Sequence, residues 1–193
     1  EIRGAGNLLG VEQHGNVDAV GFDLYSQMLT EEISLQKGEA VSEEFNPVLS
    51  LSVTAYFPPE YIDEEIVKVD FYRRLVEVRE EGEVEEIGRE LEDRFGPLPP
   101  PAMTLLKVAV LRPALKRMGI RRLEEQGGWV ALSWIEARTP GAETVAAWMK
   151  RTPPSRIRFN PQDKDTVSFR IIKGNEPEDV RLEAVQKLLR DLG

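Results

Sequence analysis

The chain has 193 residues, of which 41% are hydrophobic, 31% charged and 7% aromatic, a balance typical of a folded globular protein. The absence of cysteine excludes a disulfide framework, a thiol nucleophile and a thiolate zinc site, and the single histidine, His14, excludes a histidine-rich metal site. No apolar run approaches the roughly 18 residues that a membrane-spanning helix needs, and no signal peptide is recognisable. We therefore expect a cytoplasmic protein with no membrane partner.

The net charge of −9 is unevenly distributed along the chain. Residues 1–45 carry nine acidic and two basic side chains, residues 46–101 carry fourteen and six, and residues 102–193 carry eleven and seventeen. An acidic half and a basic half either attract each other or bind different partners, and a solvated surface of uneven composition is the simpler interpretation. The basic residues are not interleaved with aromatic ones along the sequence, so they are weak support for nucleic-acid binding.

The first 45 residues predict a loop followed by a helix. Residues 1–15, EIRGAGNLLGVEQHG, contain four glycines and no helical or strand period, which is typical of a loop. Helical spacing of apolar residues then runs from Asp18 to Gln36, and residues 38–47 resemble a linker. We expect a loop–helix appendage over residues 1–45 and a main domain over residues 46–193. Because the chain begins at Glu1, we expect it to be a fragment of a longer protein.

The main domain opens with one predicted strand and three predicted helices. Apolar and polar residues alternate over residues 49–56, which predicts a half-buried strand. Helical periods follow over residues 63–80, with Ile66 expected among the inward side chains, and over residues 84–95. A third helix is predicted from residue 102 towards Met118, with a kink or break at Pro113.

The second half of the main domain predicts further strands and two helices. The segments 121–125 and 129–135 flank Gly127–Gly128 and predict a hairpin. A short helix over residues 143–149, strands near 156–159 and 166–172, and a last helix over 177–192 complete the pattern, with Val180, Ala184, Leu188 and Leu192 expected together on the apolar face of that helix. The fold class is therefore α+β, with helices packed on a small, mostly antiparallel sheet and preceded by the loop–helix appendage.

Tests for catalytic chemistry give negative results. Gly4, Gly6 and Gly10 do not match a dinucleotide-binding fingerprint, because the last interval is one residue too long and no strand precedes them. A phosphate-binding loop of the form GxxxxGK[ST] is absent from the sequence. His14 has no serine or cysteine arranged beside it as a nucleophile, so a positioning role is the better interpretation. We expect no catalytic residues, no metal and no cofactor in this fragment.

One cluster of charged residues is unusual for its position. In the segment 90–96, Leu91 lies four residues before Phe95, so both are expected to point into the core, while Glu90, Asp93 and Arg94 project outward. Acidic side chains near a helix C-terminus oppose the helix dipole, and a Glu90–Arg94 pair offsets only part of that cost. Two interpretations stay open, a surface for an outside partner and a simple salt bridge at a helix end.

Several segments together resemble a known family. The segment RGAGNLLGVEQHG, followed by VGFDLYSQMLTEEI, resembles the end of the translocation motif of transcription-repair coupling factors and of RecG-type helicases. The later segments AYFPPEYI, FYRRL, ELEDRFGPLP, LLKVAVLR and GIRRLE resemble the coupling factors alone. The chain is thus similar to the C-terminal region of the bacterial transcription-repair coupling factor.

This resemblance implies a place in an ATP-driven translocase of double-stranded DNA, with ATP and magnesium bound by motor lobes upstream. The parent displaces stalled RNA polymerase and recruits excision repair through UvrA. In such motors Arg3 and Gln13 match residues that couple the nucleotide state to movement. The remaining chain resembles the C-terminal regulatory domain, which masks the UvrA-binding module of the same protein. Glu90, Asp93 and Arg94 align with the family residues at that contact.

Three functional hypotheses compete. The first is the regulatory domain just described, and the second is a direct DNA-binding accessory domain of a RecG-like helicase that uses the basic second half. The third, a stand-alone enzyme, is the weakest, because no nucleophile–base pair, metal cluster or nucleotide loop is found. DNA binding predicts a steep salt dependence, whereas an intramolecular contact needs a complementary protein surface.

Overall fold

The computed structural model describes residues 45–160, 162–172 and 176–193. The predicted appendage, with Arg3, Gln13 and His14, lies outside these residues, and the boundary at residue 45 stays a prediction. The elements in chain order are β1 (Val48–Ser50), α2 (Glu65–Glu77), α3 (Glu81–Phe95), α4 (Pro100–Ala109), α5 (Leu111–Met118), β2 (Ile120–Gln126), β3 (Trp129–Trp134), the 3-10 turn η2 (Glu136–Arg138), α6 (Ala142–Arg151), the 3-10 turn η3 (Pro154–Arg156), β4 (Ile157–Asn160), β5 (Asp163–Arg170) and α7 (Glu178–Leu192).

The strands form one sheet in the order β1-β2-β3-β5-β4. β1 is parallel to β2, and the other three pairings are antiparallel, which confirms the α+β class with a mostly antiparallel sheet. The β2–β3 hairpin turns at Gly127 and Gly128, whose φ angles are +58° and +78°. A two-residue turn with two positive φ angles matches the twist of the flanking strands, which explains why this hairpin needs glycine at both positions.

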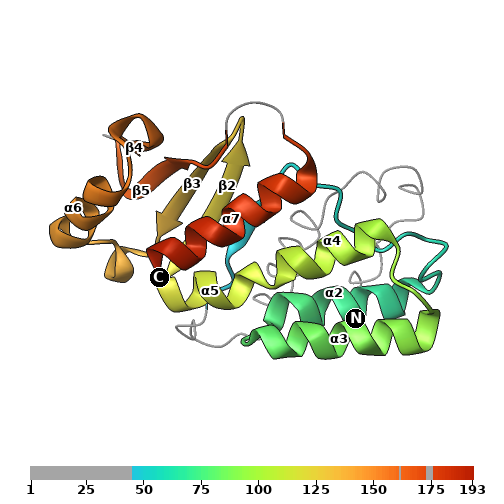
Figure 1. The fold of residues 1–193 in the computed structure, drawn as a ribbon. Helices are drawn as coiled ribbons and strands as arrows, with labels where there is room; N and C mark the ends of the chain where they lie inside the picture. The colour runs from blue at the N-terminus through green and yellow to red at the C-terminus, as the bar shows by residue number, and fades with distance from the viewer. Residues whose placement is uncertain (1–44, 161, 173–175) are drawn as a thin grey trace, which may run out of the picture.

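The helices are arranged in layers beside the sheet (Figure 1). α5 and α7 pack against one face of it, and α4 lies between α7 and the antiparallel pair formed by α2 and α3. α6 covers the far part of the same face, where the ring of Trp148 stacks 5.7 Å from that of Trp134 and meets Phe169 edge-on at 5.7 Å. The α2–α3 pair therefore lies at the opposite end of the molecule from β4 and α6.

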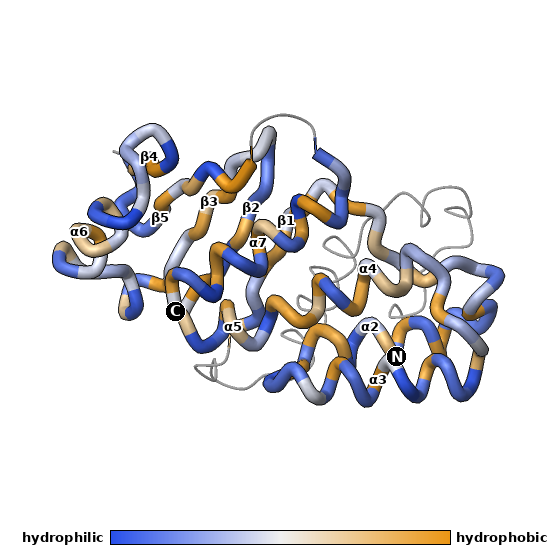
Figure 2. The backbone as a smooth tube through the Cα atoms, viewed as in Figure 1, coloured by the Kyte–Doolittle hydropathy of each residue, from blue (hydrophilic) through white to orange (hydrophobic). Residues whose placement is uncertain are grey.

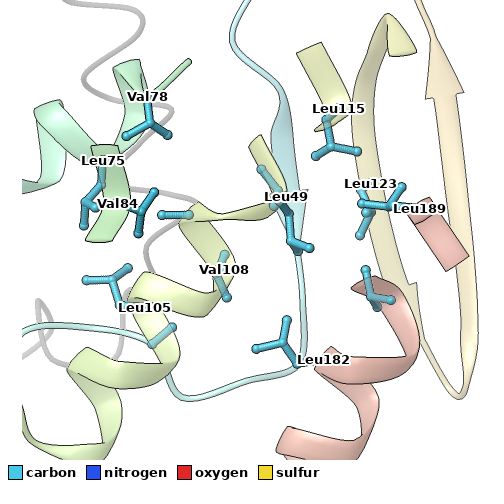
Figure 3. Close-up of a cluster of buried hydrophobic side chains, with 14 of the residues drawn as sticks. Leu49, Leu75, Val78, Val84, Leu105, Val108, Leu115, Leu123, Leu182 and Leu189 are labelled. Carbon is cyan, nitrogen blue, oxygen red and sulfur yellow. The ribbon is translucent and has the colours of Figure 1, made fainter. Parts of the chain in front are cut away.

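A single hydrophobic core joins these layers. Hydrophobic and hydrophilic residues alternate along α2 and α3, as expected for helices with one buried face (Figure 2). Figure 3 shows the meeting of the layers, with side chains from α2, α3, α4, α5, α7 and two strands in one cluster. Its labelled members are Leu49, Leu75, Val78, Val84, Leu105, Val108, Leu115, Leu123, Leu182 and Leu189.

The predicted strand over residues 49–56 is wrong in its extent, because only Val48–Ser50 pairs with a neighbour. Beyond Ser50, side chains from distant elements accept the backbone hydrogen bonds. The N–H of Ser52 donates to Oε2 of Glu125 (3.3 Å), and the N–H of Thr54 donates to Oε2 of Glu178 (2.8 Å). Arg181 joins the same network through a hydrogen bond to the Ser52 carbonyl and an ion pair with Glu125.

Two predicted inward side chains are exposed instead. Ile66 is 86% exposed and Val180 is 40% exposed. Each lies nine residues before a fully buried leucine of its own helix, Leu75 in α2 and Leu189 in α7. At 3.6 residues per turn, nine residues correspond to a rotation of about 180°, so these side chains point away from the core. The buried face of α7 is formed by Leu182, Val185 and Leu189, and the predicted Ala184 and Leu188 are half-buried.

The predicted break near Pro113 occurs three residues earlier. α4 ends at Ala109 and α5 begins at Leu111, so Pro113 stands in the first turn of α5. The first-turn N–H groups of a helix have no partner within the helix, and a proline there costs no hydrogen bond. The helical path is therefore interrupted at Val110, and the missing N–H of Pro113 costs α5 no backbone hydrogen bond.

Candidate functional site, the outer surface of α2 and α3

The candidate site predicted on α3 is built around the carboxylate of Glu90. Nη2 of Arg74 on α2 donates to its Oε2 at 2.6 Å, and Nη1 of Arg94 on α3 donates to its Oε1 at 3.1 Å. The three side chains are each between a third and a half exposed. The predicted Glu90–Arg94 pair is thus formed, and it belongs to a triad that spans two helices.

The triad fixes the charge of its central carboxylate. The hydrogen bond from Arg74 lowers the pKa of Glu90, and Arg94 lowers it further, against the opposing effect of partial burial. The same hydrogen bond raises the pKa of Arg74. Glu90 is consequently ionised at neutral pH, and the triad carries two positive charges and one negative charge.

Aromatic rings support the two arginines. The guanidinium of Arg94 lies 5.4 Å from the ring centre of Phe71 and 5.0 Å from that of Phe95, and Arg74 lies 5.1 Å from Phe71. Phe71 is fully buried in the core, while Phe95 is half-buried and meets Tyr61 edge-on at 5.8 Å. Guanidinium groups held over rings lose conformational freedom, so the triad presents a largely pre-organised surface.

Asp93 differs from its two neighbours. It is exposed and makes no hydrogen bond or ion pair with any residue that the structure describes. Leu91, two residues before it, is fully buried and anchors the same turn of α3. The structure therefore brings Glu90 and Arg94 into direct contact and leaves Asp93 with its carboxylate available beside them.

Arg74 is the site residue that the sequence did not indicate. It follows Arg73 directly, and Arg73 pairs with Asp70 on the exposed side of α2 instead. Neighbouring residues on a helix differ by about 100° in direction, so only the packing of α2 on α3 selects which arginine reaches Glu90. The segment FYRRL contains both arginines, and its local pattern does not distinguish them.

The described residues show no alternative site with metal chemistry. No group of three or more histidine, cysteine, aspartate or glutamate side chains in them is arranged to hold a metal ion. None of their helices is long and apolar enough to cross a membrane.

Comparison with known proteins places this surface in a family. The profile of the TRCF domain family matches residues 51–144, which include α2 and α3 with the whole triad. This chain contains a TRCF domain. The TRCF-domain chain is 32% identical over its whole length to the transcription-repair-coupling factor of Escherichia coli, and 40% identical over 70% of its length to that of Bacillus subtilis. It spans only 17% and 12% of those two proteins, respectively.

The fold agrees with this assignment. The crystal structure of the C-terminal domain of a transcription-repair coupling factor superposes with a TM-score of 0.60, over 79% of this chain and 97% of that domain, at 21% sequence identity. The predicted resemblance to the C-terminal region of the transcription-repair coupling factor is confirmed by the sequence matches together with this shared fold.

Proposed function

We propose that this chain is the C-terminal regulatory domain of a DNA translocase that couples transcription to excision repair. In this proposal the surface of Glu90, Asp93 and Arg94, extended by Arg74, binds the UvrA-binding module of the same protein and masks it. Support comes from the TRCF domain match and from the whole-length similarity to coupling factors. The single observation that carries the proposal is the pre-organised Arg74–Glu90–Arg94 triad beside the carboxylate of Asp93, which pairs with none of the described residues.

The physical argument rests on the mixed charge of this surface. An exposed ion pair contributes little to stability, so a triad held over aromatic rings needs another role. A partner surface with complementary charges would desolvate the triad and Asp93, and buried charge pairs across an interface discriminate strongly between partners. Two arginines can then bind carboxylates of the partner, and Asp93 can bind a partner cation.

The parent protein supplies the remaining parts of the proposal. ATP and magnesium would be bound by motor lobes upstream, and RNA polymerase, UvrA and double-stranded DNA would be partners of the whole cytoplasmic protein. Arg3 and Gln13 are proposed to couple the nucleotide state to movement along DNA. Replacing either by alanine in the full-length parent should impair translocation and spare ATP hydrolysis. A variant that moves at the normal rate would remove that residue from the proposal.

The masking function is tested by charge reversal at Asp93 in the full-length parent. Asp93→Arg should weaken the intramolecular contact, shift the protein towards the unmasked state and raise its affinity for UvrA. Glu85→Arg is the matched control, because it makes the same charge change on an exposed position of α3 two turns earlier. A well-folded Asp93→Arg protein that binds UvrA no better than Glu85→Arg would contradict the masking role of this surface.

A further inference from the structure

The two faces of the sheet differ in their cover. Val130, Leu132 and Trp134 of β3 are buried on the face against which the helices pack, where Leu189 of α7 lies beside Leu123 of β2 (Figure 3). The alternate residues of the strands point to the second face. The strand register places on that face Trp129 and Ala131 of β3, Ser168 and Arg170 of β5, and Arg158 of β4.

Arginine and tryptophan side chains meet on this second face. The guanidinium of Arg158 stacks 3.8 Å from the ring centre of Trp129, although one strand separates β4 from β3, and Arg170 approaches the same ring at 5.8 Å. Arg156, two residues before Arg158, lines a hollow together with Arg170, and Val180 at the start of α7 closes its other side. We call Trp129, Arg156, Arg158 and Arg170 the arginine face.

The arginine face carries a net positive charge. None of its three arginines forms an ion pair with a described residue. Residues 150–170 carry six basic and two acidic side chains. One of the two, Asp163, is engaged locally by the hydroxyl of Thr166 at 2.7 Å and the N–H of Asp165 at 3.1 Å. Glu176 lines the hollow, and Glu124 of β2 lies opposite Ala131 on the same face, where it pairs with Arg122.

The shape of the face suits a flat, anionic ligand. Ser168 of β5 lies between Arg158 and Ala131 of β3, and the side chains of Ser168 and Ala131 are small, so they project little from the sheet. A guanidinium stacked on an indole is held in a fixed plane, with its N–H groups directed outward at the ring's edge. Phosphate accepts two parallel hydrogen bonds from such a fork, and a nucleobase stacks on aromatic or guanidinium planes.

We propose that the arginine face binds the phosphodiester backbone of a nucleic acid. An acidic protein segment could satisfy the charge, but its carboxylates offer no aromatic face to stack on the Arg158–Trp129 pair, so the observations favour a nucleic acid. This surface lies on β3, β5 and β4, at the other end of the molecule from α2 and α3 (Figure 1). The inference is therefore independent of the masking function, and either can fail without the other.

The test measures fluorescence anisotropy of labelled 20-nucleotide DNA, single-stranded and double-stranded, with the full 193-residue chain. Three phosphate contacts predict that log K falls with log salt at a slope of about −2.7 for the duplex and about −2.1 for the single strand. From 50 to 200 mM salt, duplex affinity should therefore fall roughly 40-fold. A stronger interaction with the single strand would identify base stacking on the Arg158–Trp129 pair.

Variants decide whether the arginine face is responsible for DNA binding. R156A/R158A/R170A should abolish most of the DNA affinity and of its salt dependence. The control R89A/R117A/R190A removes three exposed arginines from the helices α3, α5 and α7 and should retain both. Arg158→Lys keeps the charge but loses the planar stack, so it should weaken single-strand binding with little change in slope. If the triple variant of the face does not fold, this conservative variant decides the question.

Three results would overturn the proposal. The first is the absence of DNA binding at 50 mM salt, and the second is an equal loss of binding in the two triple variants. The third is that poly-glutamate of equal charge displaces the labelled DNA as effectively as unlabelled DNA does. That result would assign the face to an acidic protein partner.

Discussion

Arg74 of α2 and Glu90 of α3 are joined by a 2.6 Å hydrogen bond between oppositely charged groups, across 16 residues of sequence. The pair connects two antiparallel helices at their outer surface, and the ring of the buried Phe71 supports the arginine. It thus links the core of the domain to the surface for which we propose a partner.

This pair predicts a pH-dependent contribution to stability. The folded-state pKa of Glu90 is lowered below its ordinary value of 4.5, chiefly by the hydrogen bond from Arg74. Its stabilisation is therefore fully present above that ordinary value and is lost as the pH falls through the lowered pKa. The pair is about one-third exposed. We therefore expect the free energy of unfolding of the wild type to exceed that of Glu90→Gln by only about 0.2–1 kcal/mol at neutral pH.

Urea unfolding at a series of pH values measures this difference. It should vanish in acid and shrink at high salt. A stability difference that stays constant from neutral to acidic pH would show that Glu90→Gln acts through packing and not through the charge of Glu90.

Core and surface positions of α3 should respond differently to alanine. Leu91 is fully buried, so Leu91→Ala removes apolar contacts, leaves a cavity and should lower the free energy of unfolding by about 2–5 kcal/mol. The triple change of Glu90, Asp93 and Arg94 to alanine removes exposed charges and should cost about 1 kcal/mol or less. Chemical denaturation compares the two proteins, and a triple variant as unstable as Leu91→Ala would mean that these charges support the fold.

Two glycines should give opposite results when replaced by alanine. Gly82 lies in the first turn of α3, and a Cβ atom there would meet nothing within 4 Å. Gly82→Ala should therefore stabilise the protein by roughly 0.5–1 kcal/mol through higher helix propensity.

Gly119 ends α5 with a φ of +70°, and a Cβ atom there would lie 2.4 Å from Cβ of Arg138. Gly119→Ala should therefore destabilise the protein by more than the gain expected at Gly82. Thermal unfolding of the two variants tests the pair, and a stabilised Gly119→Ala protein would contradict the close approach of η2 to the end of α5.

The sequence by itself determined the order and type of nearly all elements in the described residues. Long periodic segments such as α3 and the hairpin at Gly127–Gly128 were predictable because local propensity and turn geometry agree with the fold. The predicted strand over residues 49–56 failed beyond Ser50 because Glu125 and Glu178, which are distant in sequence, accept its backbone hydrogen bonds. No local pattern contains that information.

The same division applies to the functional surfaces. The sequence determined the composition of the α3 cluster, including the Glu90–Arg94 pair at i, i+4 spacing, because neighbours on one helix have a fixed geometry. Only the tertiary structure selected Arg74 over Arg73 as the partner of Glu90. Only the strand register brought Arg158 onto Trp129, which lies 29 positions away in a sequence that shows no interleaving of basic and aromatic residues. Contacts between elements depend on how their faces pack, and packing is a property of the whole core.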